Sequence, residues 1–208
     1  MGVIPFYGTE RPDLFRIERE AMDRAGKVID RLDALLPRLG ATLDVGAGDG
    51  FTAERLQTPQ RLVVALEPAR NMRRPRKPLA WVGGEAEHLP FRDNAFEGAF
   101  STWAYFFSRY IDVRPGLEEL RRVVRAGGPV VVIENLGDDE LSRFAQGDTS
   151  ADQEFWTKQG FICEELETLF EFADQQEADA LLSLYSGKEV KLGPKTLTYR
   201  VGLFLSEA

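Results

Sequence analysis

Apolar side chains in the first forty positions recur three and four residues apart, as they do along one face of an amphipathic helix. Pro12 suits the first turn of this helix, and Gly26 suits an interruption within it. Pro37 and Gly40 then end the helical pattern. We therefore expect an N-terminal helical segment within residues 1–40.

Between residue 41 and about residue 134, short apolar runs that stop at glycine, acidic or turn residues alternate with helical patterns. The apolar runs are residues 41–45, 62–66, 79–82, 96–101 and 130–133. A short helix is predicted over 51–56, and a longer one begins at Pro115 and stops at Gly127 and Gly128. The runs are continuously apolar, which is typical of a parallel sheet covered by helices on both faces.

The last third of the chain has a different pattern. Residues 151–159 predict a helix, and apolar residues then occupy even positions between 162 and 172. A further helix is predicted over 174–185, before a final alternating strand over 197–205. Long strands of alternating polarity are typical of antiparallel pairing. The whole pattern predicts an α/β fold of seven strands, mostly parallel, with a helical insertion before an antiparallel last strand.

Composition and charge narrow the possible partners. The 208 residues are 43% hydrophobic and 29% charged, as in an ordinary globular protein. The net charge of −8 makes nucleic acid an unlikely partner, because nucleic-acid binding depends heavily on clustered Lys and Arg. No run approaches the roughly 20 apolar residues that cross a membrane, and the start of the chain lacks the pattern of a signal peptide. Cys163 is the one cysteine, so we expect a cytoplasmic protein in which it is structural, with no disulfide and no metal site.

Three glycines, Gly46, Gly48 and Gly50, directly follow the first apolar run. Glycine lets the backbone turn tightly, approach a ligand closely and open a helix whose N-terminal amides face that ligand. Dinucleotide-binding proteins place their third glycine one residue later, where this chain has Phe51, and here an acid, Asp44, precedes the first glycine by two residues. The motif predicts a nucleotide-like ligand, and its spacing disfavours a nicotinamide-dependent oxidoreductase.

At this motif the sequence resembles the class I methyltransferase family, in which (D/E)xGxGxG follows the first strand. The resemblance continues at Glu67 and Pro68, where the family has an acidic residue that binds both ribose hydroxyls. Residues 84–91 are similar to the family's adenine-side segment, with glutamate in the place of the usual aspartate. Residues 93–101 and 121–128 resemble its fourth strand and the turn before its fifth strand.

This resemblance implies a Rossmann-like fold and S-adenosylmethionine as the cofactor, with S-adenosylhomocysteine as its product. We expect one domain over residues 1–208, made of the helical segment 1–40, a cofactor-binding core at 41–134 and a substrate-side part at 135–208. The candidate cofactor-binding residues are Asp44, Gly46, Ala47, Gly48, Gly50, Glu67, Pro68, Glu85, Ala86, Glu87 and Ser101.

The implied reaction is an in-line displacement on a sulfonium methyl, in which positioning can supply most of the acceleration. We therefore expect an enzyme without an assignable catalytic group. His88, the one histidine, lies in the adenine-side segment, where a surface or capping role is favoured over that of a general base. Aromatic residues are candidates for the acceptor pocket, with ordinary core packing as the alternative. These candidates are Tyr7, Trp103, Tyr105, Phe106 and Tyr110.

The acidic composition and the modest C-terminal part favour a small-molecule acceptor over a protein side chain. The predicted helix over 174–185 resembles a family addition that covers the mouth of the active site. A non-catalytic regulatory protein that binds the same cofactor is the alternative function, and the oligomeric state stays open between monomer and homodimer. One basic cluster is expected to be a solvated face. It consists of Arg70, Arg73, Arg74, Arg76 and Lys77.

Overall fold

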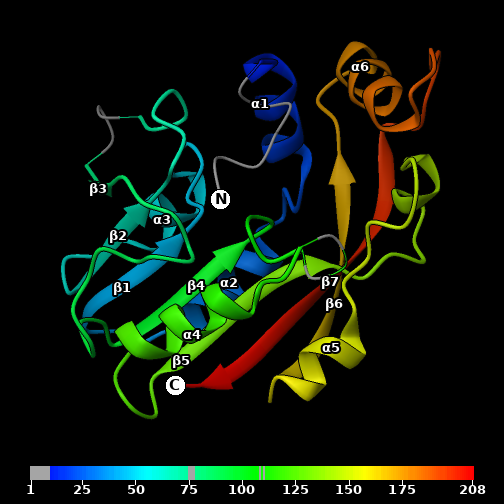
Figure 1. Ribbon diagram of the computed structural model, residues 1–208. Helices are drawn as coiled ribbons and strands as arrows, with labels where there is room; N and C mark the ends of the chain where they lie inside the picture. Colours follow the sequence, from blue (N-terminus) through cyan, green and yellow to red (C-terminus); the bar gives the residue numbers. More distant parts are fainter. Residues whose placement is uncertain (1–9, 75–77, 108, 110) are drawn as a thin grey trace.

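The computed structural model describes residues 10–74, 78–107, 109 and 111–208. Figure 1 shows a single mixed sheet in these residues, with the strand order β3-β2-β1-β4-β5-β7-β6. The strands are β1 (Gly40–Val45), β2 (Arg61–Leu66), β3 (Ala80–Val82), β4 (Gly98–Thr102), β5 (Pro129–Asn135), β6 (Ile162–Glu171) and β7 (Thr196–Glu207). The helices are α1 (Pro12–Ala21), α2 (Lys27–Leu35), α3 (Phe51–Leu56), α4 (Arg114–Val123), α5 (Gln153–Lys158) and α6 (Gln175–Ser186). No helix in the described ranges is long and apolar enough to span a membrane.

The sheet has the predicted topology. Strands β1 to β5 pair in parallel, whereas β7 lies antiparallel to both β5 and β6. The helix α6 is inserted between β6 and β7. These observations confirm the predicted Rossmann-like fold with an antiparallel last strand. The strand β4 begins two residues after the start of the apolar run 96–101. Phe96, at the start of that run, pairs with Val124 in an isolated bridge instead of joining the strand.

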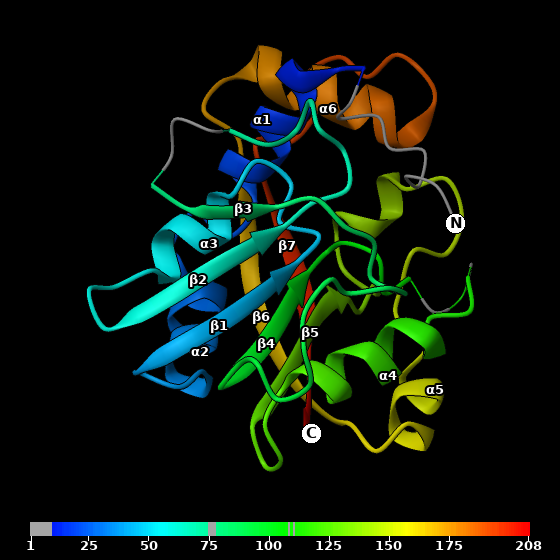
Figure 2. The same cartoon turned by 60° about the vertical axis from the view of Figure 1, so that its left-hand side comes forward.

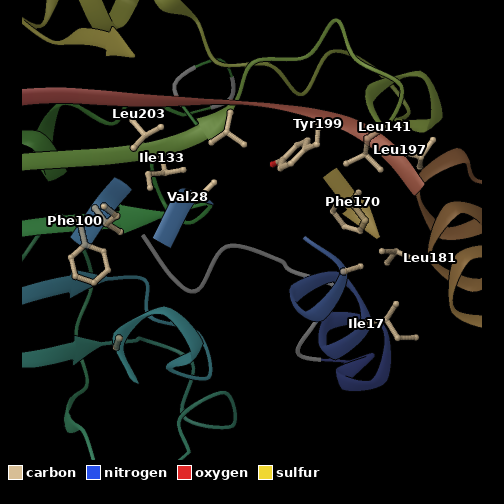
Figure 3. Packing of buried hydrophobic residues seen from close by; sticks show 14 of the residues in the cluster. Ile17, Val28, Phe100, Ile133, Leu141, Phe170, Leu181, Leu197, Tyr199 and Leu203 are labelled. Atoms are coloured by element: carbon tan, nitrogen blue, oxygen red, sulfur yellow. The ribbon is translucent and has the colours of Figure 1, made fainter. Parts of the chain in front are cut away.

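Alternate side chains of β5 enter two separate hydrophobic cores. Val131 and Ile133 pack with α1, α2, α3 and α6, and Val130 and Val132 pack with α4 and α5. Figure 2 shows α2 and α3 on one face of the sheet, α4 and α5 on the other, and α1 with α6 above the end of the sheet. Figure 3 shows part of the first core, where Tyr199 of β7 lies among apolar side chains from the helices and strands. Since both faces of the central strands are buried, most of their residues are apolar.

A short turn separates α1 from α2. Gly26, in this turn, has a φ of +77°, a conformation that favours glycine. The Asp23 carboxylate accepts hydrogen bonds from the backbone N–H groups of Lys27 at 3.1 Å and Val28 at 2.7 Å, and from the hydroxyl of Thr168 on β6 at 2.6 Å. These bonds cap α2 and fasten the N-terminal helices to the edge strand. The predicted interruption at Gly26 is confirmed.

The helices α1 and α6 pack side by side at the end of the sheet where the parallel strands β1 to β5 stop (Figures 1 and 2). Asp174 caps α6 by accepting a hydrogen bond from the backbone N–H of Glu177 at 2.9 Å. The Tyr185 hydroxyl donates to the carboxylate of Glu18 on α1, and Arg16 pairs with Glu177 at 3.3 Å. Polar contacts therefore hold α6 on α1.

One carboxyl group is buried on β5. Glu134 is 2% exposed, and its Oε1 has no hydrogen-bond partner among the described residues. Burial raises the pKa of Glu134 well above its ordinary value, because the surroundings disfavour the charged form. The folded protein therefore keeps this proton at pH values where the unfolded chain releases it.

We expect the substitution Glu134→Gln to stabilise the protein increasingly as the pH rises from the ordinary pKa of a glutamate, 4.5, towards the raised pKa of Glu134 in the folded protein. In this window the unfolded wild-type chain binds fewer protons than the folded one, so the free energy of unfolding falls by up to about 1.4 kcal/mol per pH unit. The free energy of unfolding of the Glu134→Gln variant does not fall in this way, because glutamine does not titrate. Urea unfolding at several pH values measures the difference, with the exposed Glu118→Gln on α4 as the control. A difference between Glu134→Gln and wild type that stays constant with pH would contradict the assignment.

Candidate functional site

A cavity of about 1220 Å³ opens at the carboxyl ends of β1, β2, β4 and β5, and α1, α6 and β7 add to its walls. The crevice at the carboxyl ends of an open parallel sheet is where such folds bind ligands. A pocket for one small molecule commonly occupies roughly 300–1000 Å³. This cavity is large enough for two ligands.

The loop between β1 and α3 brings the main chain to the cavity wall. Gly46, Gly48 and Gly50 have φ angles of +78°, +54° and +81°, a region that favours glycine. A Cβ atom added to Gly46 would lie 2.3 Å from the Cβ of Ala104, in the loop after β4. Gly46, Ala47 and Gly48 line the cavity, whereas Gly50 lies behind the wall as the N-cap of α3. The predicted contact of Gly50 with the cofactor stays a prediction, and in the structure Gly50 begins α3.

Glu67 follows β2 and joins the end of this strand to the glycine loop. Its Oε2 accepts a hydrogen bond from the backbone N–H of Gly48 at 2.9 Å, and its Oε1 accepts one from Ala69 at 2.8 Å. Burial raises the pKa of Glu67, whereas these two hydrogen bonds and the nearby Arg73 oppose that shift. Glu67 and Pro68 both line the cavity. The acid at the strand end therefore faces the space that a ligand would occupy.

Arg19 on α1 lies over the glycine loop. It forms an ion pair with Asp49, and its guanidinium carbon lies 4.8 Å from the ring centroid of Phe51. Burial lowers the pKa of Arg19, and its Nε has no hydrogen-bond partner within the part of the chain that the structure describes. Such a buried donor can bind an anionic group of a ligand. The sequence did not single out Arg19, because it is one of several charged positions on the polar face of α1.

Asp44 lies behind the cavity wall, in the middle of the sheet. It is 1% exposed on β1, and both carboxyl oxygens lack a hydrogen-bond partner in the described ranges. Burial and then the charge of Glu67 raise the pKa of Asp44 well above its ordinary value. The structure thus does not place Asp44 on the wall, because its side chain is enclosed between β2 and β4.

Two more predicted site residues lie in the interior. The Ser101 hydroxyl donates to the carbonyl of Val45 at 2.8 Å, and so joins β4 to β1. Phe106 is fully buried, with its ring centroid 5.0 Å from that of Tyr105 and 6.4 Å from that of Trp156. Neither Ser101 nor Phe106 lines the cavity, and their predicted contacts with cofactor and acceptor stay predictions. The side chains of both point into the core.

The adenine-side segment does reach the cavity. Glu85, Ala86 and Glu87 line it on the side of β2, as the family pattern predicts for a cofactor-binding segment. Their contact with a cofactor stays a prediction. His88 is exposed and does not line the cavity, and its backbone N–H donates to the carbonyl of Glu85 at 3.2 Å.

Trp103 and Tyr105 are the predicted acceptor-side residues that line the cavity. Trp103 has a φ of +46°, which is uncommon for a bulky residue and occurs most often at functional sites. Burial raises the pKa of Tyr105, and the charge of Glu87 adds to the shift. Tyr7 and Tyr110 lie outside the described residues.

The C-terminal part adds two aromatic wall residues that the sequence did not reveal. Tyr185 comes from α6 and Tyr199 from β7. The Tyr199 hydroxyl donates to the side-chain oxygen of Asn135 at the end of β5. The apolar periodicity of both segments indicated only buried positions, so no local signal distinguished these residues from core.

The basic cluster after β2 is only partly described. Arg70 and Arg74 are exposed and Arg73 is half-buried, whereas Arg76 and Lys77 lie outside the described residues. The exposed side chains of Arg70 and Arg74 fit the predicted solvated face.

Cys163 lies half-buried on β6. Burial raises the pKa of its thiol to about 11, so the thiol stays protonated at neutral pH. Within residues 10–74, 78–107, 109 and 111–208, no three His, Cys, Asp or Glu side chains are grouped as a metal site requires.

The glycine loop, the acid after β2 and the crevice beside them are the features of a Rossmann-like domain, a fold that binds ligands at this end of its sheet. Residues 43–132 match a family model described as a methyltransferase domain. This match confirms, over these residues, the resemblance to the class I methyltransferase family found in the sequence.

Curated relatives agree with this family. The chain is 33% identical over 152 residues to a malonyl-[acyl-carrier protein] O-methyltransferase of Dechloromonas aromatica, an alignment that covers 65% of this chain and 56% of the relative. It is 32% identical over 111 residues to a demethylmenaquinone methyltransferase of Paenarthrobacter aurescens, covering 51% of this chain and 42% of the relative. The chain therefore spans about half the length of these curated relatives.

Solved structures share the fold. A Thermotoga maritima protein, described as a SAM-dependent methyltransferase and possible histamine N-methyltransferase, superposes with a TM-score of 0.60 and is 20% identical, covering 92% of this chain and 93% of that one. A Bacillus halodurans protein described as a putative methyltransferase gives a TM-score of 0.58 at 16% identity, covering 86% of this chain and 96% of that one. At these identities the likeness concerns the fold alone.

We expect Gly46→Ala to destabilise the protein far more than Gly127→Ala. Both glycines have nearly the same φ, +78° and +75°, so the cost of a left-handed alanine, about 1 kcal/mol, is shared. A Cβ at Gly127 meets nothing within 4 Å, whereas one at Gly46 overlaps Ala104 and adds about 1–3 kcal/mol. Urea unfolding of the two variants measures the difference, and equal losses would show that the close approach of the two loops has no energetic consequence.

Proposed function

We propose that this chain binds S-adenosylmethionine at the glycine loop and transfers its methyl group to a small-molecule acceptor held in the same cavity. The observation that carries this proposal is the placement of Glu67 on the cavity wall, with its carboxylate fixed by two backbone amides next to the glycine loop. A carboxylate held in this way suits the paired hydroxyls of a ribose.

The residues present fit this cofactor. A carboxylate has about four acceptor sites, so Glu67 keeps capacity for two hydroxyls beyond its two amide bonds. The unpartnered Nε of Arg19 lies over the same loop and suits the carboxylate at the amino-acid end of the cofactor. Glu85, Ala86 and Glu87 line the side where the adenine would lie.

The chain's own contribution to the reaction is positioning. When bound, S-adenosylmethionine supplies a methyl group on an already activated sulfonium. The glycine loop and Glu67 would orient that group, and the half of the cavity between α1, α6 and β7 would hold the acceptor in line with it. Holding two reactants in attack geometry accounts for much of the rate of such a transfer, and the α1–α6 pair limits the access of water.

The names of the curated relatives supply two candidate acceptor classes, a malonyl carrier-protein ester and a demethylmenaquinone. Each alignment covers only part of the relative, so neither acceptor is carried over to this chain. A small-molecule acceptor agrees with the acidic composition and with the volume of the cavity. A cytoplasmic location stays a prediction.

We expect Glu67→Gln to weaken the binding of S-adenosylmethionine and S-adenosylhomocysteine by about 10- to 100-fold, since hydrogen bonds to a charged acceptor contribute about 1.5–3 kcal/mol. Isothermal titration calorimetry measures the dissociation constants. Glu118→Gln, on an exposed position of α4 outside the cavity, serves as the matched control. Unchanged affinity in Glu67→Gln would remove Glu67 from the cofactor site.

A labelled-methyl assay over a panel of metabolites tests the transfer itself. We expect label from S-adenosylmethionine to appear in a small molecule and S-adenosylhomocysteine to accumulate in equal amount. Tight cofactor binding with no transfer to any acceptor would instead indicate a regulatory protein, and tight NAD binding without binding of the sulfonium compound would overturn the proposal.

A further inference from the structure

The cavity has a second half that the cofactor would not fill. The glycine loop and Glu67 follow β1 and β2, so a nucleoside bound there lies over that side of the sheet. On the other side the wall is built from the ends of β4 and β5, from β7, and from α1 and α6. If the proposed function is correct, this second half is the place of the acceptor.

Aromatic rings dominate this half. Trp103 and Tyr185 are half-buried wall residues, and Tyr199 is buried against Trp103, with ring centroids 6.3 Å apart and planes inclined by 30°. The positive φ of Trp103 shows that the backbone is held in an uncommon conformation where it presents this ring. Aromatic faces carry negative partial charge and attract cations.

The charged side chains beside these rings are carboxylates, so they are negative like the aromatic faces. Glu18 of α1 accepts a hydrogen bond from Tyr185, and Asp139, after β5, accepts hydrogen bonds from the backbone N–H groups of Ser142 and Arg200. Burial raises the pKa of Tyr199, and the charges of Glu18 and Asp139 add to the shift. These two carboxylates therefore disfavour a further negative charge beside Tyr199.

The described cavity wall has fewer basic than acidic side chains, and its basic side chains do not lie beside these rings. Nine carboxyl side chains line the cavity, against three arginines. Arg19 pairs with Asp49, and Arg55 lies over Phe51 at 3.4 Å, both beside the glycine loop. The third, Arg24, is an exposed residue of the turn between α1 and α2.

From this arrangement we infer that the acceptor is a small organic cation, an amine-bearing molecule with an apolar body, whose ammonium group binds between Glu18 and the rings of Trp103 and Tyr185. This inference rests on the proposed function and specifies the substrate class of the same site. A carboxylate-bearing acceptor would instead face Glu18 and Asp139 with no partner of opposite charge among the residues described around Tyr199.

Two probes of equal shape and opposite charge test the inference on the full-length chain. Benzyltrimethylammonium and benzylsulfonate share their aromatic body, and neither can accept a methyl group at nitrogen. After the affinity for S-adenosylhomocysteine has been measured, each probe is titrated by calorimetry into the protein saturated with that compound. We expect the ammonium probe to bind at least about tenfold more tightly than the sulfonate.

Variants locate the effect. Glu18→Gln keeps an oxygen for the Tyr185 hydroxyl but removes the charge, and should weaken the ammonium probe about tenfold while the affinity for S-adenosylhomocysteine stays unchanged. Tyr185→Phe keeps the ring and should change the affinity less than Glu18→Gln does. Glu118→Gln is the control, and it should behave as wild type. Should Glu18→Gln not fold, the salt dependence of wild-type binding gives the same information, since an ion pair weakens as ionic strength rises.

The inference is overturned if the sulfonate binds as tightly as the ammonium probe, if neither probe binds, or if a folded Glu18→Gln keeps the full preference for the cation. Failure of the proposed function has a different outcome, because S-adenosylhomocysteine itself would then not bind. In that case the probes are titrated into the protein alone, and a retained preference for the cation that depends on Glu18 still supports the ammonium site.

Discussion

The carboxylate of Glu67 holds together the two loops on which the cavity depends. It bonds to the amide of Gly48 on one side and to that of Ala69 on the other, while the carbonyl of Leu66 accepts hydrogen bonds from Gly46 and Ala47. A buried carboxylate is tolerated only where such bonds replace water. The ends of β1 and β2 therefore form one unit, whose geometry is set before any ligand binds.

The strand order places the rest of the cavity around this unit. The strand β1 lies between β2 and β4, so the loops that follow β1 and β4 diverge and leave a crevice. The close approach of Gly46 and Ala104 marks the place where these two loops still touch. The antiparallel pair β6 and β7, with α6 between them, then extends the wall beyond β5. The C-terminal third of the chain thus completes a site that the parallel half begins.

Local signals in the sequence predicted most of the fold and the cofactor side of the cavity. Each of these signals lies within a few consecutive residues, so it can be recognised without the tertiary structure. They are the continuous apolar runs, the glycine spacing and the acid after β2. The positions of Asp44, Ser101 and Phe106 behind the cavity wall could not be predicted, because a motif does not tell which face of a strand or loop a side chain takes, and a shift of one position reverses it. Arg19, Tyr185 and Tyr199 were missed because only the packing of α1, α6 and β7 brings these distant positions to one cavity.

This division also explains why similarity to known proteins is informative about one half of the cavity and not the other. The family match spans residues 43–132, which contain the glycine loop, Glu67 and the adenine-side segment. Of the side chains that surround the second half, Glu18, Tyr185 and Tyr199 lie outside that span, and Trp103 lies inside it. The match therefore covers the glycine loop and the adenine-side segment, whereas most of the side chains around the second half come from parts of the chain that the family model does not reach. The inference about the acceptor therefore depends on Glu18, Asp139 and the aromatic rings of this chain, and not on the substrates of its relatives.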